Sequence, residues 1–235
     1  MQAYFDEEIK PSSFAEGFYE LNFYGNNFNC IFSDKTYNEF KTDKLQDLSI
    51  IKQGLLIRNA SGILIKGGEP LLQRQALLSI FSFCKKNNIK TAIKTNLSKP
   101  LILKSLLKSN MIDIVIADII TDKKDFKNIT RAGTFFESAD QIYSDILKSI
   151  KILKKYDKEA EIIFQTEIVP GYVFRKETLL EIADLIKNIN CSWQLKTYVP
   201  ISNSMLKNVT PVSQDFIDNL KEIIKNNCPN IVVNQ

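Results

Sequence analysis

The chain has 235 residues, of which 44% are hydrophobic and 25% are charged, with 8 Gly and 7 Pro. This composition is typical of an ordinary globular protein, and the length suits one α/β domain with a full core, so we expect a single domain over residues 1–235. The formal net charge of +4 is too small to indicate binding to nucleic acid or to an anionic membrane.

The chain shows no sign of a membrane segment or of an export signal. No apolar run approaches the roughly 20 residues that span a bilayer, and the first residues, MQAYFDEEIK, contain no apolar signal core. We therefore expect a cytoplasmic protein with neither a membrane nor a nucleic acid as its partner.

Histidine is absent, which excludes His-based catalytic triads and His-ligated metal sites. The cysteines are scattered and form no C-x-x-C pair, so they indicate neither a zinc site nor a disulfide framework. They are Cys30, Cys84, Cys191 and Cys228.

Short β-branched or aromatic runs alternate with longer segments of helical period, which is typical of βαβ units around a parallel sheet. The predicted strands, in chain order, are Phe18 to Tyr24, Gly62 to Lys66, Thr91 to Lys94, Ile112 to Ala117, Glu161 to Ile168 and Ser192 to Tyr198. The predicted helices cover residues 72–84, 139–156, 179–189 and 212–226, and Ser213 is the expected N-cap of the last helix.

In a parallel barrel the functional residues lie in the loops that follow the strands. The candidate residues in those loops are Gly25-Asn26-Asn27, Gly67-Gly68-Glu69-Pro70, Thr95-Asn96 and Asp118. Gly67 and Gly68 would let the backbone approach a ligand, Glu69 could pair with an ammonium group, and Pro70 could begin a helix. An ordinary tight turn between strand and helix is the alternative reading of these four residues.

The segment ILIKGGEPLLQ, residues 63–73, resembles the motif with which radical S-adenosylmethionine (SAM) enzymes bind the SAM amino group. Other segments resemble motifs of the small activating enzymes of anaerobic ribonucleotide reductase and pyruvate formate-lyase. They are PSSFAEG (11–17), IKTAIKTNLS (89–98), MIDIVIADI (111–119), IIFQTEIVPG (162–171) and WQLKTYVP (193–200).

This resemblance covers nearly the whole chain and implies an α/β fold, an incomplete parallel (β/α)6 barrel of the radical SAM type. It also implies a cofactor-binding pocket made of Gly67, Gly68, Glu69, Pro70, Thr95, Asn96 and Asp118. The alternative is that these residues only satisfy loop amides and helix N-termini at the mouth of the barrel.

The family's cluster loop, G-C-x-x-x-C-x-x-C-H-N, holds a four-iron-four-sulfur cluster on three thiolates. In the matching loop of this chain, Asn26, Cys30 and Ser33 occupy the three ligand positions. Amide and hydroxyl oxygens are poor ligands for iron that prefers thiolate sulfur. We therefore expect no catalytic residue, no metal and no cofactor, with a 4Fe-4S cluster absent and SAM bound weakly at most; Cys30 could still be a thiol that faces the pocket.

Two further positions depart from the family pattern. Gln165 stands where the family has a fifth-strand arginine, and Ile120 stands where it has a fourth-strand lysine. Both changes predict a loss of positive charge from a pocket whose natural ligand carries a carboxylate.

These observations favour a degenerate radical-SAM-like protein that acts as a non-catalytic scaffold or regulatory subunit, with a larger enzyme or complex as its protein partner. The alternatives are an active activating-type oxidoreductase whose iron-sulfur ligands come from elsewhere, and a SAM-binding module.

Overall fold

The computed structural model of the protein describes residues 1–207, 209–228 and 231–234. Its main sheet has eight strands in the order β10-β9-β8-β7-β6-β5-β3-β2. Six of them match the predicted strands to within a few residues: β3 (Phe18–Phe23), β5 (Gly62–Gly67), β6 (Lys90–Thr95), β7 (Ile114–Asp118), β8 (Glu161–Ile168) and β9 (Ser192–Thr197). All neighbours among these six are parallel, which confirms the predicted α/β class and parallel sheet.

Four short strands were not predicted. β10 (Val232–Asn234) extends the sheet in parallel beside β9, and β2 (Lys10–Pro11) pairs antiparallel with β3. β1 (Gln2–Tyr4) and β4 (Leu45–Asp47) form a separate antiparallel pair. The sheet is therefore wider than the six strands that the sequence indicates.

Seven α-helices are described, and four of them were predicted. The predicted helices are α2 (Arg74–Lys86), α5 (Ala139–Lys155), α6 (Lys176–Ile186) and α7 (Gln214–Asn227). The Ser213 hydroxyl accepts the backbone N–H of Phe216 at 3.3 Å, which confirms this residue as the N-cap of α7. The others are α1 (Ser49–Ile57), α3 (Pro100–Lys108) and α4 (Lys123–Thr130), and the 3-10 helices are η1 (Thr42–Lys44) and η2 (Pro70–Gln73).

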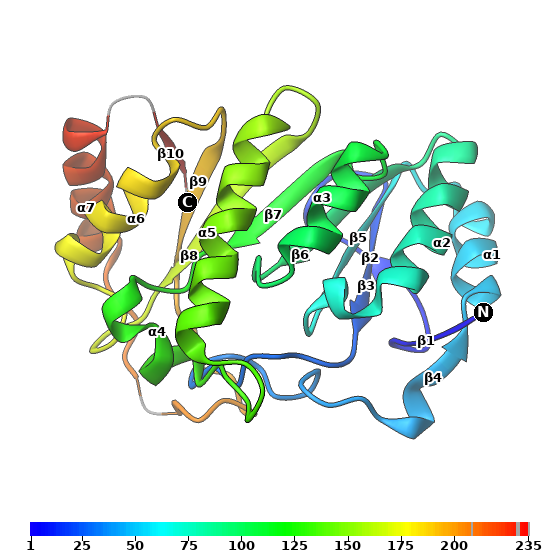
Figure 1. The fold of residues 1–235 in the computed structure, drawn as a ribbon, viewed down its shortest axis with the longest axis horizontal. Coiled ribbons are helices and arrows are strands. Elements are labelled where there is room, and N and C mark those ends of the chain that lie inside the picture. Colours follow the sequence, from blue (N-terminus) through cyan, green and yellow to red (C-terminus); the bar gives the residue numbers. More distant parts are fainter. Residues whose placement is uncertain (208, 229–230, 235) are drawn as a thin grey trace.

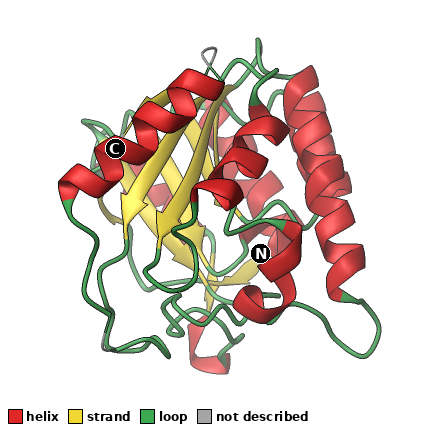
Figure 2. Cartoon of the chain, turned by 90° about the vertical axis from the view of Figure 1, so that its left-hand side faces the viewer, coloured by secondary structure: helices red, strands yellow, loops and turns green. Residues whose placement is uncertain are grey.

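The helices pack against the outer side of the curved sheet, with α2, α3 and α5 side by side over its central strands (Figures 1 and 2). The loops that follow the parallel strands gather at one end of the molecule, at the lower edge of Figure 1, where α4 also lies. None of the helices within the described residues is long and apolar enough to cross a membrane.

Alternate residues of each strand point to opposite faces of the sheet, and both faces carry buried apolar side chains. Ile63, Ile65 and Val115 belong to the large core between the sheet and the helices. The inner face carries a separate apolar cluster, made of Phe18, Leu64, Ala92, Ile114, Ile116 and Ile163.

Toward the carboxyl ends of the strands the inner face becomes polar. Two residues beyond Leu64 and Ala92 the next inward positions are Lys66 and Lys94, and Asp118 follows Ile116 in the same way. An apolar floor thus lies beneath a polar layer, and this layer forms the base of the candidate site.

Candidate functional site

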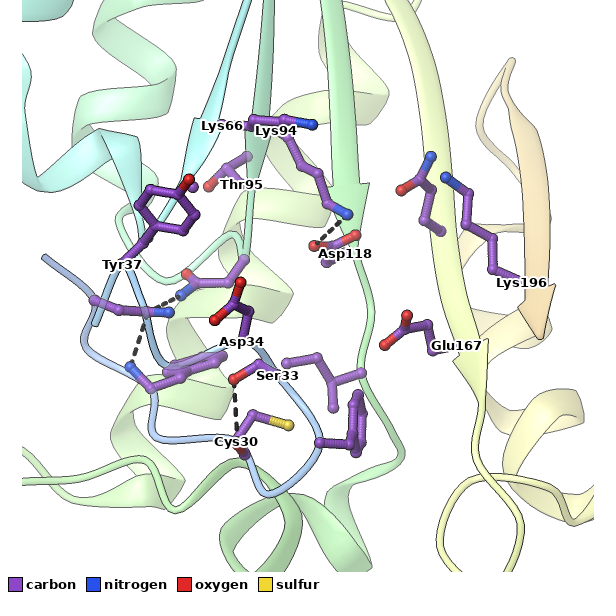
Figure 3. Close-up of a pocket in the computed structure, with 18 of the residues that line it drawn as sticks. Cys30, Ser33, Asp34, Tyr37, Lys66, Lys94, Thr95, Asp118, Glu167 and Lys196 are labelled. Atoms are coloured by element: carbon purple, nitrogen blue, oxygen red, sulfur yellow. Dashed lines mark hydrogen bonds and ion pairs between the residues drawn. The ribbon is translucent and has the colours of Figure 1, made fainter. Parts of the chain in front are cut away.

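A cavity of about 330 Å³ opens at the carboxyl ends of the parallel strands (Figure 3). Its wall includes Gly67, Gly68, Thr95, Asn96 and Asp118. The structure thus brings five of the seven expected cofactor-binding residues to one cavity, while Glu69 and Pro70 are not part of its wall. Whether the five contact a cofactor stays a prediction.

The two glycines are required by the close approach of two chain segments. Gly67 has a φ of +109°, and a Cβ on Gly68 would lie 2.1 Å from the carbonyl oxygen of Gly25. The amides of Gly68 and Glu69 donate to the carbonyls of Phe23 and Gly25, both at 2.8 Å. These two N–H groups therefore tie the turn to the end of β3, so they are not free to bind a ligand.

The Glu69 carboxyl group is fully buried and stabilises the loops behind the cavity wall. It accepts the backbone N–H groups of Leu71 at 2.9 Å and Asn96 at 2.7 Å, and the Thr95 hydroxyl at 2.9 and 3.0 Å. Burial raises its pKa to about 7, although the three donors lower it. This placement supports the alternative reading of Glu69 and Thr95, in which they satisfy groups in the loops, and Pro70 begins the 3-10 helix η2 as its first residue.

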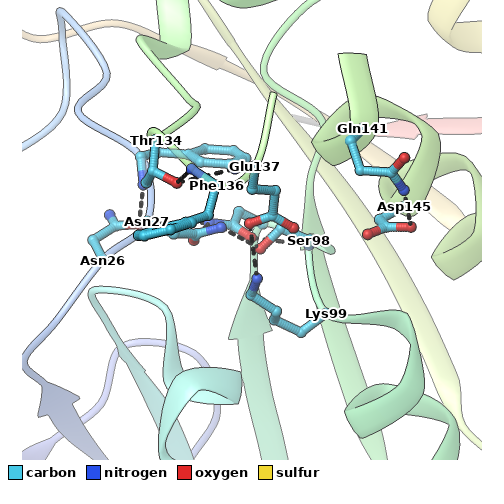
Figure 4. Close-up of polar contacts among 11 residues, drawn as sticks. Asn26, Asn27, Ser98, Lys99, Thr134, Phe136, Glu137, Gln141 and Asp145 are labelled. Carbon is cyan, nitrogen blue, oxygen red and sulfur yellow. Dashed lines mark hydrogen bonds and ion pairs between the residues drawn. The ribbon is translucent and has the colours of Figure 1, made fainter. Parts of the chain in front are cut away.

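A network of amide side chains links residues 25–34 after β3, here called the mouth loop, to the end of β6 (Figure 4). Asn96 Nδ2 donates to Asn27 Oδ1 at 3.0 Å, and Asn27 Nδ2 donates to Ser98 Oγ at 2.8 Å. Nearby, the ion pair between Lys99 and Glu137, at 3.3 Å, holds the loop before α5 against the start of α3. The two loops are thereby fixed at the cavity rim.

The mouth loop does not offer the donor set of a cluster held by three thiolates. Asn26 Oδ1 accepts the backbone N–H of Phe28 at 3.0 Å, and the Ser33 hydroxyl donates to the Cys30 carbonyl at 3.2 Å. Cys30 lines the cavity but is 3% exposed, and burial raises the pKa of its thiol to about 11. The residues of this loop supply one thiol where the resemblance calls for three, so the loop by itself does not fit such a cluster.

The other cysteines lie away from the cavity. Cys84 is buried in α2, Cys191 immediately precedes β9 at the opposite end of the sheet, and Cys228 follows α7. Among the described residues, no group of three or more Cys, His, Asp or Glu side chains could hold a metal ion.

The cavity is richer in positive charge than the sequence indicates. Gln165 and Ile120 do line it, but so do Lys66, Lys94 and Lys196, from β5, β6 and β9. The two positions thus add no charge to the cavity wall, while three lysines that the sequence did not point to supply positive charge to the same cavity. Lys66 and Lys94 lie two residues beyond Leu64 and Ala92 of the inner apolar cluster, whereas Lys196 follows Gln194, so no apolar residue on that face of β9 marks it.

No family model matches the chain. A putative glycyl-radical enzyme activating enzyme of Methanocaldococcus jannaschii is 27% identical over 176 residues, which are 74% of this chain and 70% of that protein. The pyruvate formate-lyase-activating enzyme of Clostridium pasteurianum is 31% identical over 133 residues, 56% of this chain and 50% of that enzyme. The chain thus spans about half of the second relative.

Solved structures share the fold. A radical SAM methyltransferase from Sphaerobacter thermophilus superposes with a TM-score of 0.73 at 12% identity, over 94% of this chain and 67% of that one. SuiB from Streptococcus suis bound to SAM gives 0.61 at 17% identity, over 89% of this chain and 47% of that one. The incomplete barrel of the radical SAM type is thereby confirmed.

One sequence-based expectation needs correction. The expectation that no cofactor belongs to this chain is contradicted by its relatives, which are named as activating enzymes of a glycyl-radical enzyme and of pyruvate formate-lyase, and by the SAM bound in two structures of the same fold. That expectation rested on the cluster-ligand positions, where Asn26 and Ser33 stand in place of two thiols, although a cavity lies beside this loop.

Proposed function

We propose that this chain, a radical SAM activase-like protein, binds SAM in the cavity at the carboxyl ends of its strands and acts as a SAM-binding subunit of a larger protein assembly. One observation carries the proposal: the cavity holds both charge signs in a wall built from the segments that resemble the family's SAM-binding motifs.

SAM combines a carboxylate and an ammonium group with ribose hydroxyls and an adenine ring. The ribose hydroxyls can donate to Asp118, whose carboxylate lies 3.3 Å from the Lys94 amine. The carboxylate of SAM can be bound by a lysine on the inner side of the barrel, here called the lumen, which replaces the cation that Gln165 does not supply. The cavity volume of about 330 Å³ lies at the lower end of the usual range for small-molecule pockets, roughly 300 to 1,000 Å³.

Calorimetry with SAM on the wild type and on Asp118→Asn tests the proposal. The substitution keeps the shape of the side chain and removes its charge, so it should weaken SAM binding roughly tenfold or more, as the loss of one charge-assisted hydrogen bond does.

Asp113→Asn is the matched control. Asp113 pairs with Lys85 at 2.5 Å and precedes the same strand, β7, at the end opposite to the cavity. This variant should lose stability but keep its affinity for SAM. Absence of saturable SAM binding to the wild type, or equal affinities in both variants, would contradict the proposal.

The partner is proposed to be a larger enzyme, because the relatives are named for activating other enzymes. Exposed apolar side chains lie on loops at the cavity end: Phe135 and Phe136, 97% and 93% exposed, precede α5, and Val199, 68% exposed, follows β9. The ion pair between Lys99 and Glu137 places the Phe135–Phe136 loop beside the cavity rim (Figure 4). The rings of Phe135 and Phe136 contact each other, with centroids 5.2 Å apart, and aromatic side chains are enriched at protein interfaces.

The double variant Phe135→Ser/Phe136→Ser tests this surface. Affinity purification from the native source, with mass spectrometry, should identify a large enzyme bound to the wild type and depleted with the variant. Equal recovery with both proteins would exclude these phenylalanines from the interface.

Catalysis is the second candidate function, and the names of the relatives favour it. It requires iron ligands from another chain. Iron content after anaerobic reconstitution of the complex, together with formation of 5′-deoxyadenosine from SAM, separates an activating enzyme from a binding subunit.

A further inference from the structure

The edge of the lumen formed by β8 and β9 carries polar side chains in two successive rows. Gln165 lies opposite Gln194, and two residues further Glu167 lies opposite Lys196. Gln165, Glu167 and Lys196 all line the cavity. In Figure 3 the carboxylate of Glu167 is directed into the space between the strands and the mouth loop.

Two of the three lumen lysines are paired with carboxylates. Lys66 lies 2.9 Å from Glu20, and Lys94 lies 3.3 Å from Asp118. Within the described part of the chain, Lys196 and Glu167 make no ion pair within 4.0 Å, although they are direct neighbours in the register of β8 and β9. The lumen thus keeps one positive and one negative side chain available.

A third group at the same edge is also available. Gln165 is 7% exposed, and its Nε2 donates to Gln194 Oε1 at 2.7 Å. Its Oε1 is buried and has no hydrogen-bond partner among the described residues. A buried carbonyl oxygen without a donor costs free energy, so the Gln165 oxygen favours a ligand that brings an N–H group.

We propose that Lys196, Glu167 and Gln165 form a binding site for an α-amino acid group, with the carboxylate on Lys196 and the ammonium shared between Glu167 and the Gln165 Oε1 atom. The ammonium group has three donors, and so can satisfy both acceptors. Lys196 is assigned to the carboxylate because the other two lumen lysines, Lys66 and Lys94, are already paired with carboxylates of the protein.

The surroundings of the two charged groups agree with this assignment. Burial, and secondarily Lys94, lowers the pKa of Lys196, whereas burial raises the pKa of Glu167. An opposite charge on a ligand would favour the charged form of each side chain.

The same α-amino acid chemistry has two sources, a free amino acid and the methionyl end of SAM. Only the second source rests on the proposed function. Three probes separate them: L-methionine, SAM, and 5′-methylthioadenosine, which retains the nucleoside and lacks the amino acid end.

Calorimetry with these probes is carried out on the full chain and on two variants, Lys196→Met and Glu167→Gln. Each substitution should weaken binding of L-methionine roughly tenfold or more, the effect of losing one charge-assisted hydrogen bond. Lys151→Met on α5 and Glu181→Gln on α6 change exposed residues of the same types outside the cavity, and should leave the affinity unchanged. Both lumen side chains are open to water within the cavity, and equal melting temperatures would show that the variants fold.

The outcomes are distinct. If both substitutions weaken SAM and L-methionine but not 5′-methylthioadenosine, the site holds the methionyl end of SAM. If both substitutions weaken binding of L-methionine, and SAM either does not bind or binds all the proteins equally, the site holds a free amino acid. The SAM proposal is then judged separately. If L-methionine fails to bind the wild type and SAM affinity is the same in all proteins, the inferred site is wrong.

Discussion

Glu69 is a carboxyl group without access to solvent, held by three donors from two loops. A residue in this position joins the turn after β5 to the end of β6, and so shapes the cavity wall without contributing its own charge to the lumen. Its raised pKa therefore concerns the stability of the folded protein and not the binding of a ligand.

The pH dependence of stability tests this role. The pKa of Glu69 is about 7 in the folded protein, against 4.5 for the group in water, so between these values the folded state binds more protons than the unfolded chain. Its contribution to the free energy of unfolding therefore falls as pH rises from about 4.5 to about 7, by on the order of 3 kcal/mol, and is constant above that range.

Glu69→Gln should abolish this pH-dependent fall in the free energy of unfolding, however much the substitution changes that free energy at a fixed pH. Urea unfolding of both proteins at a series of pH values measures the difference between them, in which the other titrating groups cancel. A constant difference from pH 4.5 to pH 7 would show that Glu69 does not titrate in that range.

At the scale of elements, Asp122 connects two helices. Its carboxylate caps α4 by accepting the backbone N–H of Asp125 at 3.0 Å, and it accepts the Thr178 hydroxyl of α6 at 2.6 Å. Asp122 is 5% exposed, so its removal leaves the buried Thr178 hydroxyl without this partner. The Ser213 hydroxyl caps α7 and makes no second hydrogen bond within the described part of the chain.

Asp122→Ala should therefore destabilise the protein by about 2 to 4 kcal/mol, the sum of a lost cap and an unsatisfied buried donor. Ser213→Ala should cost about 1 kcal/mol. Chemical denaturation of the two variants gives both values, and a cost for Asp122→Ala no larger than that for Ser213→Ala would contradict the bridging role.

Helices were predictable where a long apolar stripe exists. In α5 the buried residues recur at helical spacing over 17 residues, whereas α4 has 8 residues with four charged side chains, and its lysines indicate a solvated face. In α3, PLILKSLLK, most residues are apolar, so the buried face cannot be separated from the exposed Leu101. The three-residue β10 is too short to give any period.

At the scale of the molecule, the resemblance of ordered segments predicted the barrel and the end at which the cavity lies. It did not predict the charges inside, because whether a strand residue points inward depends on the closure of the sheet. Lys94 and Lys196 lie on different strands, and nothing in the sequence shows that they face one lumen. The place of Glu69 behind the cavity wall was not evident for the same reason, since its position after the strand does not show that its carboxyl group is fully buried.

We propose that the cavity persists as a SAM site although the mouth loop offers one thiol. A crystal structure of the protein grown with SAM tests this proposal. We expect SAM in the cavity lined by Gly68, Asn96 and Asp118. An empty cavity at saturating SAM, or SAM bound elsewhere on the surface, would contradict it.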